Sequence, residues 1–283
     1  MIGVIGGSGL YQLEGLENLE ELSIDTPYGP PSDVLMKGSL AGREVVFLPR
    51  HARGHRLLPT EINHRANIWA LRSLGVRFII CVTAVGSLKE EYAPGHVLVP
   101  DQYYDRTSSR ENHTFFGHGL VAHVSLADPY SENLRQILIN STAHTGIPVH
   151  QAGTYVNMDG PAFSSRAESL ANRQLGFDLI GMTNVPEAKL AREAEIALAT
   201  LCMVTDYDCW KPHEEAVNTS SVLEVLLSNA ENAKTILSHA LPKIPTEATW
   251  PEHRSLATAF ATPKDLWPAE TVTKLQPLLQ PYL

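Results

Sequence analysis

Short apolar runs recur along the chain and alternate with segments whose apolar residues have helical periodicity. Several of the runs are almost continuously apolar, which is typical of strands covered on both faces of a sheet. The predicted strands are residues 2–5, 44–48, 78–83, 96–100, 179–182 and 196–205. Their alternation with helices predicts an α/β fold around a mostly parallel sheet.

The helical segments carry end signals. Residues 60–74 are predicted to form a helix with Thr60 as its N-cap and Gly75 just past its end. Capping-box pairs, a Ser followed three residues later by a Glu, predict further helices of about 10 and about 20 residues. These pairs are Ser165 with Glu168 and Ser221 with Glu224.

A single domain is expected to span residues 1–283, because no repeat, low-complexity tract or Gly/Ser linker interrupts the pattern. From Pro245 onward prolines become frequent and the periodicity weakens. Residues 245–283 are therefore predicted to be a Pro-rich C-terminal extension that wraps the domain or packs on a neighbouring subunit. A partly mobile extension is the alternative.

Composition narrows the class of protein. A hydrophobic content of 43% and a charged content of 19% are typical of soluble globular proteins. The net charge of −9 argues against nucleic-acid or membrane-surface partners. No apolar run approaches the roughly 20 residues that span a bilayer. The three cysteines have no CxxC spacing, which favours reduced thiols in a cytoplasmic protein.

Two carboxylates, Asp206 and Asp208, follow the last predicted strand. Ligands of α/β sheets bind beyond the carboxyl ends of strands, so this position suggests a site. If the backbone stays extended, both side chains point to the same side, and like charges that close favour keeping one proton on the pair. Acid–base chemistry, a metal site and a solvated turn all remain open at this point.

Other strand ends carry donors suited to an anion. Gly6, Gly7 and Gly9 around Ser8 would let backbone N–H groups approach a ligand, but their spacing is not the GxGxxG of dinucleotide sites. A phosphate-sized anion is therefore favoured over NAD, with a tight turn that binds nothing as the alternative. Arg50 follows a second strand and has the planar fork that suits phosphate oxygens.

The remaining strand ends strengthen this interpretation when taken together. Thr83 and Thr183 end two more strands and add hydroxyl donors. Donors at several strand ends and carboxylates at one suit a site that holds phosphate at one end and a nitrogen base at the other. Zinc is disfavoured because the histidines show no recognised ligand spacing, and no GxSxG elbow marks an acyl-transfer nucleophile.

Motifs in a fixed order along residues 2 to about 240 support a more specific interpretation. They are Gly6-Gly7-Ser8-Gly9-Leu10, Pro49-Arg50-His51, Asn67-Ile68-Trp69-Ala70-Leu71, Thr83-Ala84-Val85-Gly86-Ser87-Leu88, Gly160-Pro161-Ala162-Phe163-Ser164-Ser165-Arg166-Ala167-Glu168, Met182-Thr183-Asn184-Val185-Pro186-Glu187 and Thr205-Asp206-Tyr207-Asp208-Cys209-Trp210. With these motifs the chain resembles the 5′-methylthioadenosine phosphorylases of the trimeric purine nucleoside phosphorylase superfamily.

The resemblance implies a three-layer α/β/α fold with a mixed, mostly parallel central sheet. It implies phosphorolysis of 5′-methylthioadenosine to adenine and 5-methylthioribose 1-phosphate, in purine and methionine salvage. Inorganic phosphate would be a co-substrate, with no other cofactor and no metal, and the protein would be a homotrimer.

The resemblance also implies roles for residues. Phosphate would lie among Ser8, Arg50, His51, Thr83, Ala84 and Thr183. Met182 would lie against the ribose, and Phe163, Asp206 and Asp208 would contact the purine. The methylthio pocket would be lined by His123, Val217, Val222 and Leu223 and completed by an adjacent subunit.

The chemistry of such a reaction fits the aspartates. Cleavage of an N-glycosidic bond leaves negative charge on the departing base, and a proton delivered to N7 relieves it. Asp206 is the candidate acid, which requires a pKa raised by roughly 3 units, worth about 4 kcal/mol. Asp208 would face the exocyclic amine and disfavour the carbonyl of 6-oxopurines.

The sequence also departs from the family pattern. Ala162 stands where relatives carry Arg, and Thr219 brings a hydroxyl to an expected apolar pocket, which weakens the expected preference for a 5′-methylthio group over a hydroxyl. Residues 157–159 also differ from the usual ones. The alternatives are a phosphorylase of broader specificity that accepts adenosine or 6-oxopurine nucleosides such as methylthioinosine, a nucleosidase that uses water, and a non-catalytic nucleotide-binding sensor.

Overall fold

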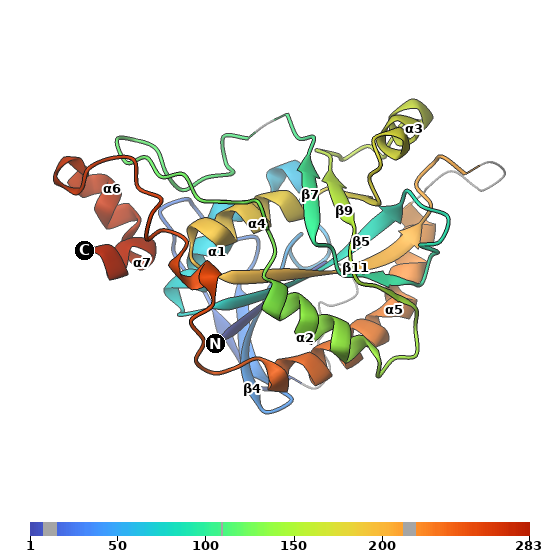
Figure 1. The fold of residues 1–283 in the computed structure, drawn as a ribbon. Helices are drawn as coiled ribbons and strands as arrows, with labels where there is room; N and C mark the ends of the chain where they lie inside the picture. Colours follow the sequence, from blue (N-terminus) through green and yellow to red (C-terminus); the bar gives the residue numbers. More distant parts are fainter. Residues whose placement is uncertain (8–15, 109, 212–218) are drawn as a thin grey trace.

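A computed structural model describes residues 1–7, 16–108, 110–211 and 219–283, except the side chains of residues 219, 221–224 and 226–228. The described residues form a mixed sheet of 11 strands at the centre of the molecule (Figure 1). Its main path runs β2-β3-β4-β1-β5-β10-β9-β7, and β11 lies on the second edge of β5, followed by β6 and β8. The strands are β1 (Ile2–Gly6), β2 (Glu17–Leu22), β3 (Leu35–Leu40), β4 (Arg43–Pro49), β5 (Phe78–Ser87), β6 (Val97–Leu98), β7 (Gln102–Asp105), β8 (Val149–His150), β9 (Thr154–Asn157), β10 (Leu179–Gly181) and β11 (Ala197–Asp206).

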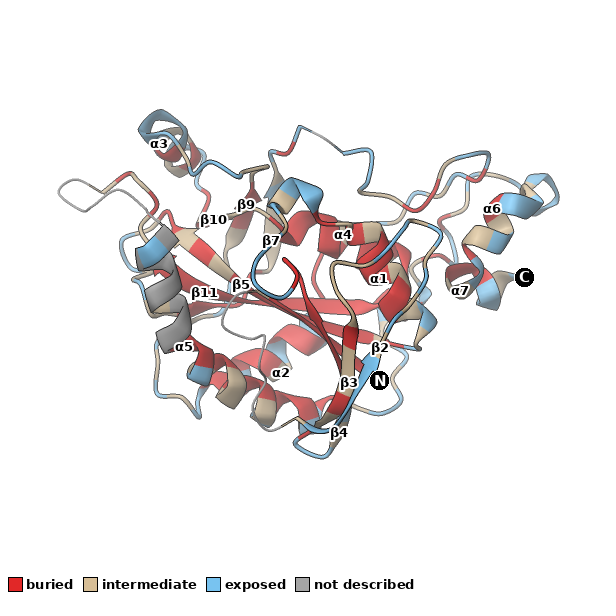
Figure 2. Cartoon of the chain, turned by 180° about the vertical axis from the view of Figure 1, so that it is seen from behind, coloured by how far each residue is buried: buried red, intermediate tan, exposed pale blue. Residues whose placement is uncertain are grey.

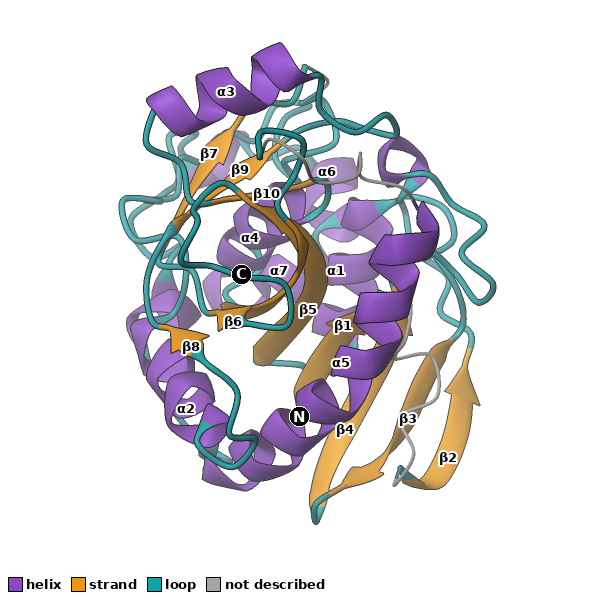
Figure 3. Ribbon diagram, turned by 90° about the vertical axis from the view of Figure 1, so that its right-hand side faces the viewer, coloured by secondary structure: helices purple, strands orange, loops and turns teal. Residues whose placement is uncertain are grey.

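Helices cover both faces of this sheet (Figure 3). One buried cluster joins α2 and α5 to one face, and a second joins α1, α4 and the C-terminal helices to the other. The helices are α1 (His64–Ser73), α2 (Glu132–Thr142), α3 (Arg166–Gln174), α4 (Asn184–Glu193), α5 (Thr219–Ala240), α6 (Ala269–Lys274) and α7 (Gln276–Leu279). The expected three-layer α/β/α fold with a mixed, mostly parallel sheet is confirmed.

The long strand β5 brings the site together. Its first half pairs in parallel with β1, and its end pairs antiparallel with β10. Strand β11 runs along its other edge in parallel, with a register shift between Val204 and Asp206. Because β1 also pairs in parallel with β4, the carboxyl ends of β4, β1, β5 and β11 lie at one edge of the sheet. Figure 2 shows that β5 and β11 are buried along most of their length.

All the predicted strands are found, with shifted ends. Strand β5 continues four residues beyond its predicted end, to Ser87, and β6 is reduced to two residues. The prediction missed β2, β3, β7, β8 and β9. Most residues of β2 are exposed, and β7, β8 and β9 are at most four residues long, so their own patterns give little signal.

Two predicted helix starts are wrong. Thr60 lies in a 3-10 turn, and the chain becomes extended at Ile62, so the first helix begins later, with Asn63 as its N-cap. The Asn63 side chain accepts a hydrogen bond from the Ala66 amide at 3.1 Å. Ser221 lies inside α5, which is already helical at residue 219. The capping box of Ser165 in α3 is confirmed.

The C-terminal extension packs on its own chain, beside α1 and α4. The Trp69 indole donates to the carbonyl of Lys274 at 3.1 Å, and the Tyr282 hydroxyl donates to Glu195 at 2.5 Å. The extension also holds the segment before α2, because the His123 amide donates to the carbonyl of Ala259 at 2.8 Å. Contact with a neighbouring subunit stays a prediction. Within the described ranges, no helix is long and apolar enough to cross a membrane.

Candidate active site

A cavity of about 510 Å³ opens at the carboxyl ends of β1, β4, β5 and β11. This volume is within the usual range for small-molecule sites. The predicted site residues that line it are Arg50, His51, Thr83, Ala84, Phe163, Met182, Thr183, Asp206 and Asp208. The structure therefore brings the expected anion donors and the expected base-binding carboxylates into one space.

The remaining predicted residues have other positions. His123 is not among the residues that line this cavity. Ser8 and Val217 lie outside the described residues. Val222 and Leu223 belong to α5, but their side chains lie outside the description. The methylthio pocket inferred from them stays a prediction.

Arg50 directly follows β4 and is buried, with 1% of its surface exposed. Its Nε donates to Glu187 Oε1 at 2.5 Å, and one terminal nitrogen donates to Glu187 Oε2 at 3.0 Å. The other terminal nitrogen donates to the carbonyl of Val82 at 3.0 Å. Burial works against the charged guanidinium, but Glu187 outweighs it and raises the pKa of Arg50. A fixed cation therefore faces the cavity.

His51 lies beside Arg50 and is uncharged at neutral pH. Burial lowers the pKa of His51 to about 4, helped by the charge of Arg50 and opposed by a hydrogen bond to the carbonyl of Leu57. The ring stacks on His55, with centroids 4.3 Å apart, and burial also lowers the pKa of His55. Both imidazoles thus contribute hydrogen-bonding atoms rather than positive charge.

Two buried threonines add hydroxyl groups. Thr83 lies within β5, whose parallel partner β1 ends next to it at Gly6. Thr183 is the N-cap residue of α4, but its side chain makes no capping hydrogen bond. Its hydroxyl is therefore not used by the helix, and the N-terminus of α4 carries the partial positive charge of the helix dipole, which favours an anion.

Asp206 and Asp208 both line the cavity, but not through an extended backbone. Asp208 has a φ of 52°, so the extended backbone on which the same-side prediction depended is not present. The reason is local: Asp206 Oδ1 accepts the Asp208 amide at 2.7 Å, which curls the chain, and Asp206 Oδ2 accepts the Thr205 hydroxyl at 2.7 Å. The two carboxyl groups therefore have different surroundings.

Asp208 is the more enclosed carboxyl group, with 8% of its surface exposed. Its Oδ2 has no hydrogen-bond partner in the part of the chain that the structure describes. Burial raises the pKa of Asp208, against the opposing effect of the Ser169 and Ser164 hydroxyls. This oxygen is fully enclosed, so a donor that reached it would satisfy an otherwise unpaired acceptor.

Gly86 has a role that the sequence did not assign to it. A Cβ atom at this position would lie 2.9 Å from Asp206 Oδ1 and 3.1 Å from the side chain of Ile180. A side chain at this position would displace the Asp206 carboxylate or Ile180, so the absence of a Cβ lets β5 approach Asp206 closely.

Two further polar residues were not assigned a role from sequence. Asn229 of α5 lines the cavity with 5% of its surface exposed, and its Nδ2 has no partner among the described residues. An Asn on the apolar face of a helix was the available signal. Glu187 lay inside a recognised motif, but its contact with Arg50 joins residues 137 positions apart. Among described residues, no group of three or more His, Cys, Asp or Glu side chains could hold a metal ion.

Comparisons with known proteins agree with this geometry. A family model described as the phosphorylase superfamily matches residues 1–242. The S-methyl-5′-thioadenosine phosphorylase of Koribacter versatilis is 51% identical over 281 residues, which cover 99% of this chain and 96% of that protein. Curated S-methyl-5′-thioadenosine phosphorylases from several other organisms match at similar identity.

Solved structures give the same result. A methylthioadenosine phosphorylase from an antarctic soil metagenomic library superposes with a TM-score of 0.92 and 49% identity, over 98% of each chain. A mutant of the adenosine/methylthioadenosine phosphorylase from Schistosoma mansoni, in complex with methylthioadenosine, has a TM-score of 0.85 and 35% identity, and the match covers 94% of this chain and 99% of that one. The chain therefore belongs to the phosphorylase superfamily and, within it, to the S-methyl-5′-thioadenosine phosphorylases.

Proposed function

We propose that this protein catalyses the phosphorolysis of 5′-methylthioadenosine to adenine and 5-methylthioribose 1-phosphate. The observation that carries the proposal is one cavity with two chemically distinct groups. Arg50, Thr83 and Thr183 supply donors for an anion, and Asp206 and Asp208 supply carboxyl groups for a base. Relatives at about 50% identity carry this activity in their names.

The reaction follows from this division. A phosphate oxygen bonds to C1′ of the ribose while the bond from C1′ to N9 of the purine breaks. Phosphate held beside the sugar stabilises its oxocarbenium character, and positioning both reactants lowers the barrier further. Asp206 delivers a proton to N7 of the departing adenine, and Asp208 accepts a hydrogen bond from the exocyclic amine. The hydrogen bonds that Asp206 accepts from the Asp208 amide and the Thr205 hydroxyl favour its ionised form, so the acid role requires that the bound purine and the enclosed site favour the protonated form.

The residues that contact the ribose, the purine face and the methylthio group are also part of the proposal. Met182 is proposed to lie against the ribose and Phe163 against the purine; both residues line the cavity. His123 is not among the residues that line this cavity, and it is proposed to complete the methylthio pocket of a neighbouring subunit in a homotrimer.

A substrate panel tests the proposal. Methylthioadenosine, adenosine and methylthioinosine are each incubated with the protein at saturating phosphate, and release of the base is followed. We expect the highest kcat/KM for methylthioadenosine. The Schistosoma mansoni relative is described as an adenosine/methylthioadenosine phosphorylase, so adenosine is the informative competitor. Comparable kcat/KM for methylthioinosine would contradict the assignment of Asp208.

A further inference from the structure

The guanidinium of Arg50 is almost fully committed before any ligand arrives. A guanidinium has five N–H donors. Glu187 accepts two of them, the carbonyl of Val82 accepts one, and the carbonyl of Ile5 lies 3.5 Å from the nitrogen that holds the fourth. The fifth hydrogen is on the same terminal nitrogen that donates to the carbonyl of Val82. This nitrogen lies 3.7 Å from the point where a Cβ of Gly7 would be, at the start of the glycine-rich segment.

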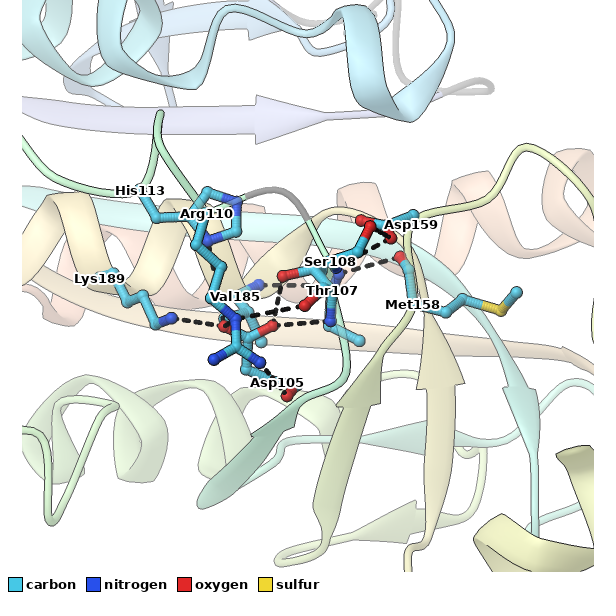
Figure 4. Close-up of polar contacts among 10 residues, drawn as sticks. Asp105, Thr107, Ser108, Arg110, His113, Met158, Asp159, Val185 and Lys189 are labelled. Atoms are coloured by element: carbon cyan, nitrogen blue, oxygen red, sulfur yellow. Dashed lines mark hydrogen bonds and ion pairs between the residues drawn. The ribbon is translucent and has the colours of Figure 1, made fainter.

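The partner of Arg50 is itself held firmly. Glu187 has 1% of its surface exposed and lies in the first turns of α4. The Val185 amide of this helix donates to Asn157 at 3.1 Å, and Lys189 donates to Asp105 at 2.5 Å. Figure 4 shows Lys189, Thr107 and Arg110 gathered around the Asp105 carboxylate at the end of β7. Helix α4 is therefore anchored on both sides of Glu187.

The charge of Glu187 and the geometry of its contact with Arg50 have opposite effects on the binding of an anion. The carboxylate of Glu187 balances the charge of Arg50, which weakens the general attraction of the site for phosphate. The same carboxylate binds the guanidinium in a bidentate way and fixes the direction of its remaining N–H. A shorter or neutral side chain at residue 187 separates these two effects.

We propose that Glu187 is a positioning residue that holds Arg50 in the orientation needed to bind phosphate, an inference that rests on the proposed function. Glu187 does not line the cavity, so it acts on a bound anion through Arg50, the cavity-lining residue with which it forms an ion pair. Its contribution belongs to phosphate binding rather than to nucleoside binding. Orientation, rather than net positive charge, is what this ion pair supplies.

The test compares matched variants. Glu187→Asp keeps the charge but withdraws the carboxylate by one methylene group. Glu193→Asp is the control, because Glu193 is also buried on α4, accepts hydrogen bonds from Thr114 and Phe115, and does not line the cavity. The KM for phosphate, the KM for methylthioadenosine and kcat are measured for each, together with the thermal midpoint.

We expect Glu187→Asp to raise the KM for phosphate about 10-fold or more, because a displacement of about 1 Å can cost up to 10²-fold in a positioned site. The KM for methylthioadenosine at saturating phosphate should change less than about two-fold. Glu193→Asp should lower the thermal midpoint without changing the KM for phosphate. Glu187→Gln, which can accept only one of the two bonds, should also raise the KM for phosphate and serves if the Asp variant does not fold.

The contrary outcomes are distinct. An unchanged or lowered KM for phosphate in Glu187→Asp, or in Glu187→Gln if the first is insoluble, overturns the positioning role. A lowered value in Glu187→Gln, which removes the charge, would show that the charge of Glu187 matters and its geometry does not. If the wild-type protein releases adenine without phosphate, the proposed function itself fails, whatever the variants do.

Discussion

Replacement of Asp208 by Asn should reverse the selectivity of the site for the purine. Asp208 lines the cavity and is buried, and its enclosed Oδ2 has no partner in the described part of the chain, so a donor that reaches this oxygen is strongly favoured. The amine of adenine supplies that donor. An Asn side chain at this position can instead donate to the carbonyl of a 6-oxopurine. The backbone at residue 208 has a φ of 52°, which Asn tolerates, so the variant should fold.

The size of the effect follows from the enclosed setting. A hydrogen bond to a charged group contributes about 1.5–3 kcal/mol, and an unpaired buried acceptor costs about 1–3 kcal/mol. With methylthioadenosine, the variant loses the hydrogen bond to the charged carboxylate. With methylthioinosine, the variant no longer has the unpaired acceptor facing the carbonyl of the base. At about 1.4 kcal/mol per factor of ten, the ratio of their kcat/KM values should fall by roughly 10²–10⁴.

The protonation of Asp208 gives a second check on its role, because it makes both stability and selectivity depend on pH. Burial raises the pKa of Asp208, so the folded state binds this proton more tightly than the unfolded state does. Its contribution to stability is therefore present at low pH and lost as pH rises through the folded pKa. Asn lacks this dependence, so the stability of the variant relative to wild type should increase as pH rises through the folded pKa of Asp208. Wild-type selectivity for methylthioadenosine should increase as Asp208 ionises.

The assay is release of the base from both nucleosides over a series of pH values, with unfolding followed in parallel. If the ratio of kcat/KM values in Asp208→Asn stays within about two-fold of wild type, Asp208 does not contact the 6-position of the purine, since even one lost hydrogen bond is worth more than that.

The remaining predictions concern the acid, its neighbour and a buried glutamate. Asp206→Asn should lower kcat by roughly 10² or more, because a general acid is lost, and near-normal turnover would remove Asp206 from that role. Gly86→Ala would place a methyl group 2.9 Å from Asp206 Oδ1, so kcat should fall while the protein stays folded by circular dichroism; normal kcat would show that the carboxylate can move freely. Burial raises the pKa of Glu193 from 4.5 to about 7, so its contribution to stability is present below about pH 4.5 and lost as pH rises through 7. This amounts to about 3 kcal/mol, and urea unfolding of Glu193→Gln should show a flatter dependence on pH than wild type, with parallel curves as the contrary result.

The strand ends of the site could be predicted because buried strands leave a clear pattern in the sequence. Strands β1, β5 and β11 are almost entirely buried, so their apolar runs are continuous, and polar residues directly after them must lie at one edge of a parallel sheet. Strands such as β2 and β9 could not be found in this way. They are exposed or short, and pairing with neighbours stabilises them more than their own residues do.

The finer geometry of the site depends on contacts between distant residues. The curl at Asp208 arises from one hydrogen bond to Asp206 and a register shift against β5, neither of which leaves a pattern in the sequence. In the sequence, Glu187 resembles any acidic residue in the first turn of a helix, where a negative charge interacts favourably with the helix dipole. Only the fold shows that it is buried against Arg50.

The central claim is that phosphate, and not water, cleaves the nucleoside. The most direct measurement follows methylthioadenosine with and without inorganic phosphate and identifies the sugar product by phosphorus NMR. We predict that adenine release requires phosphate and is matched one for one by 5-methylthioribose 1-phosphate. Adenine release at the same rate without phosphate, with free methylthioribose as the product, would contradict the claim.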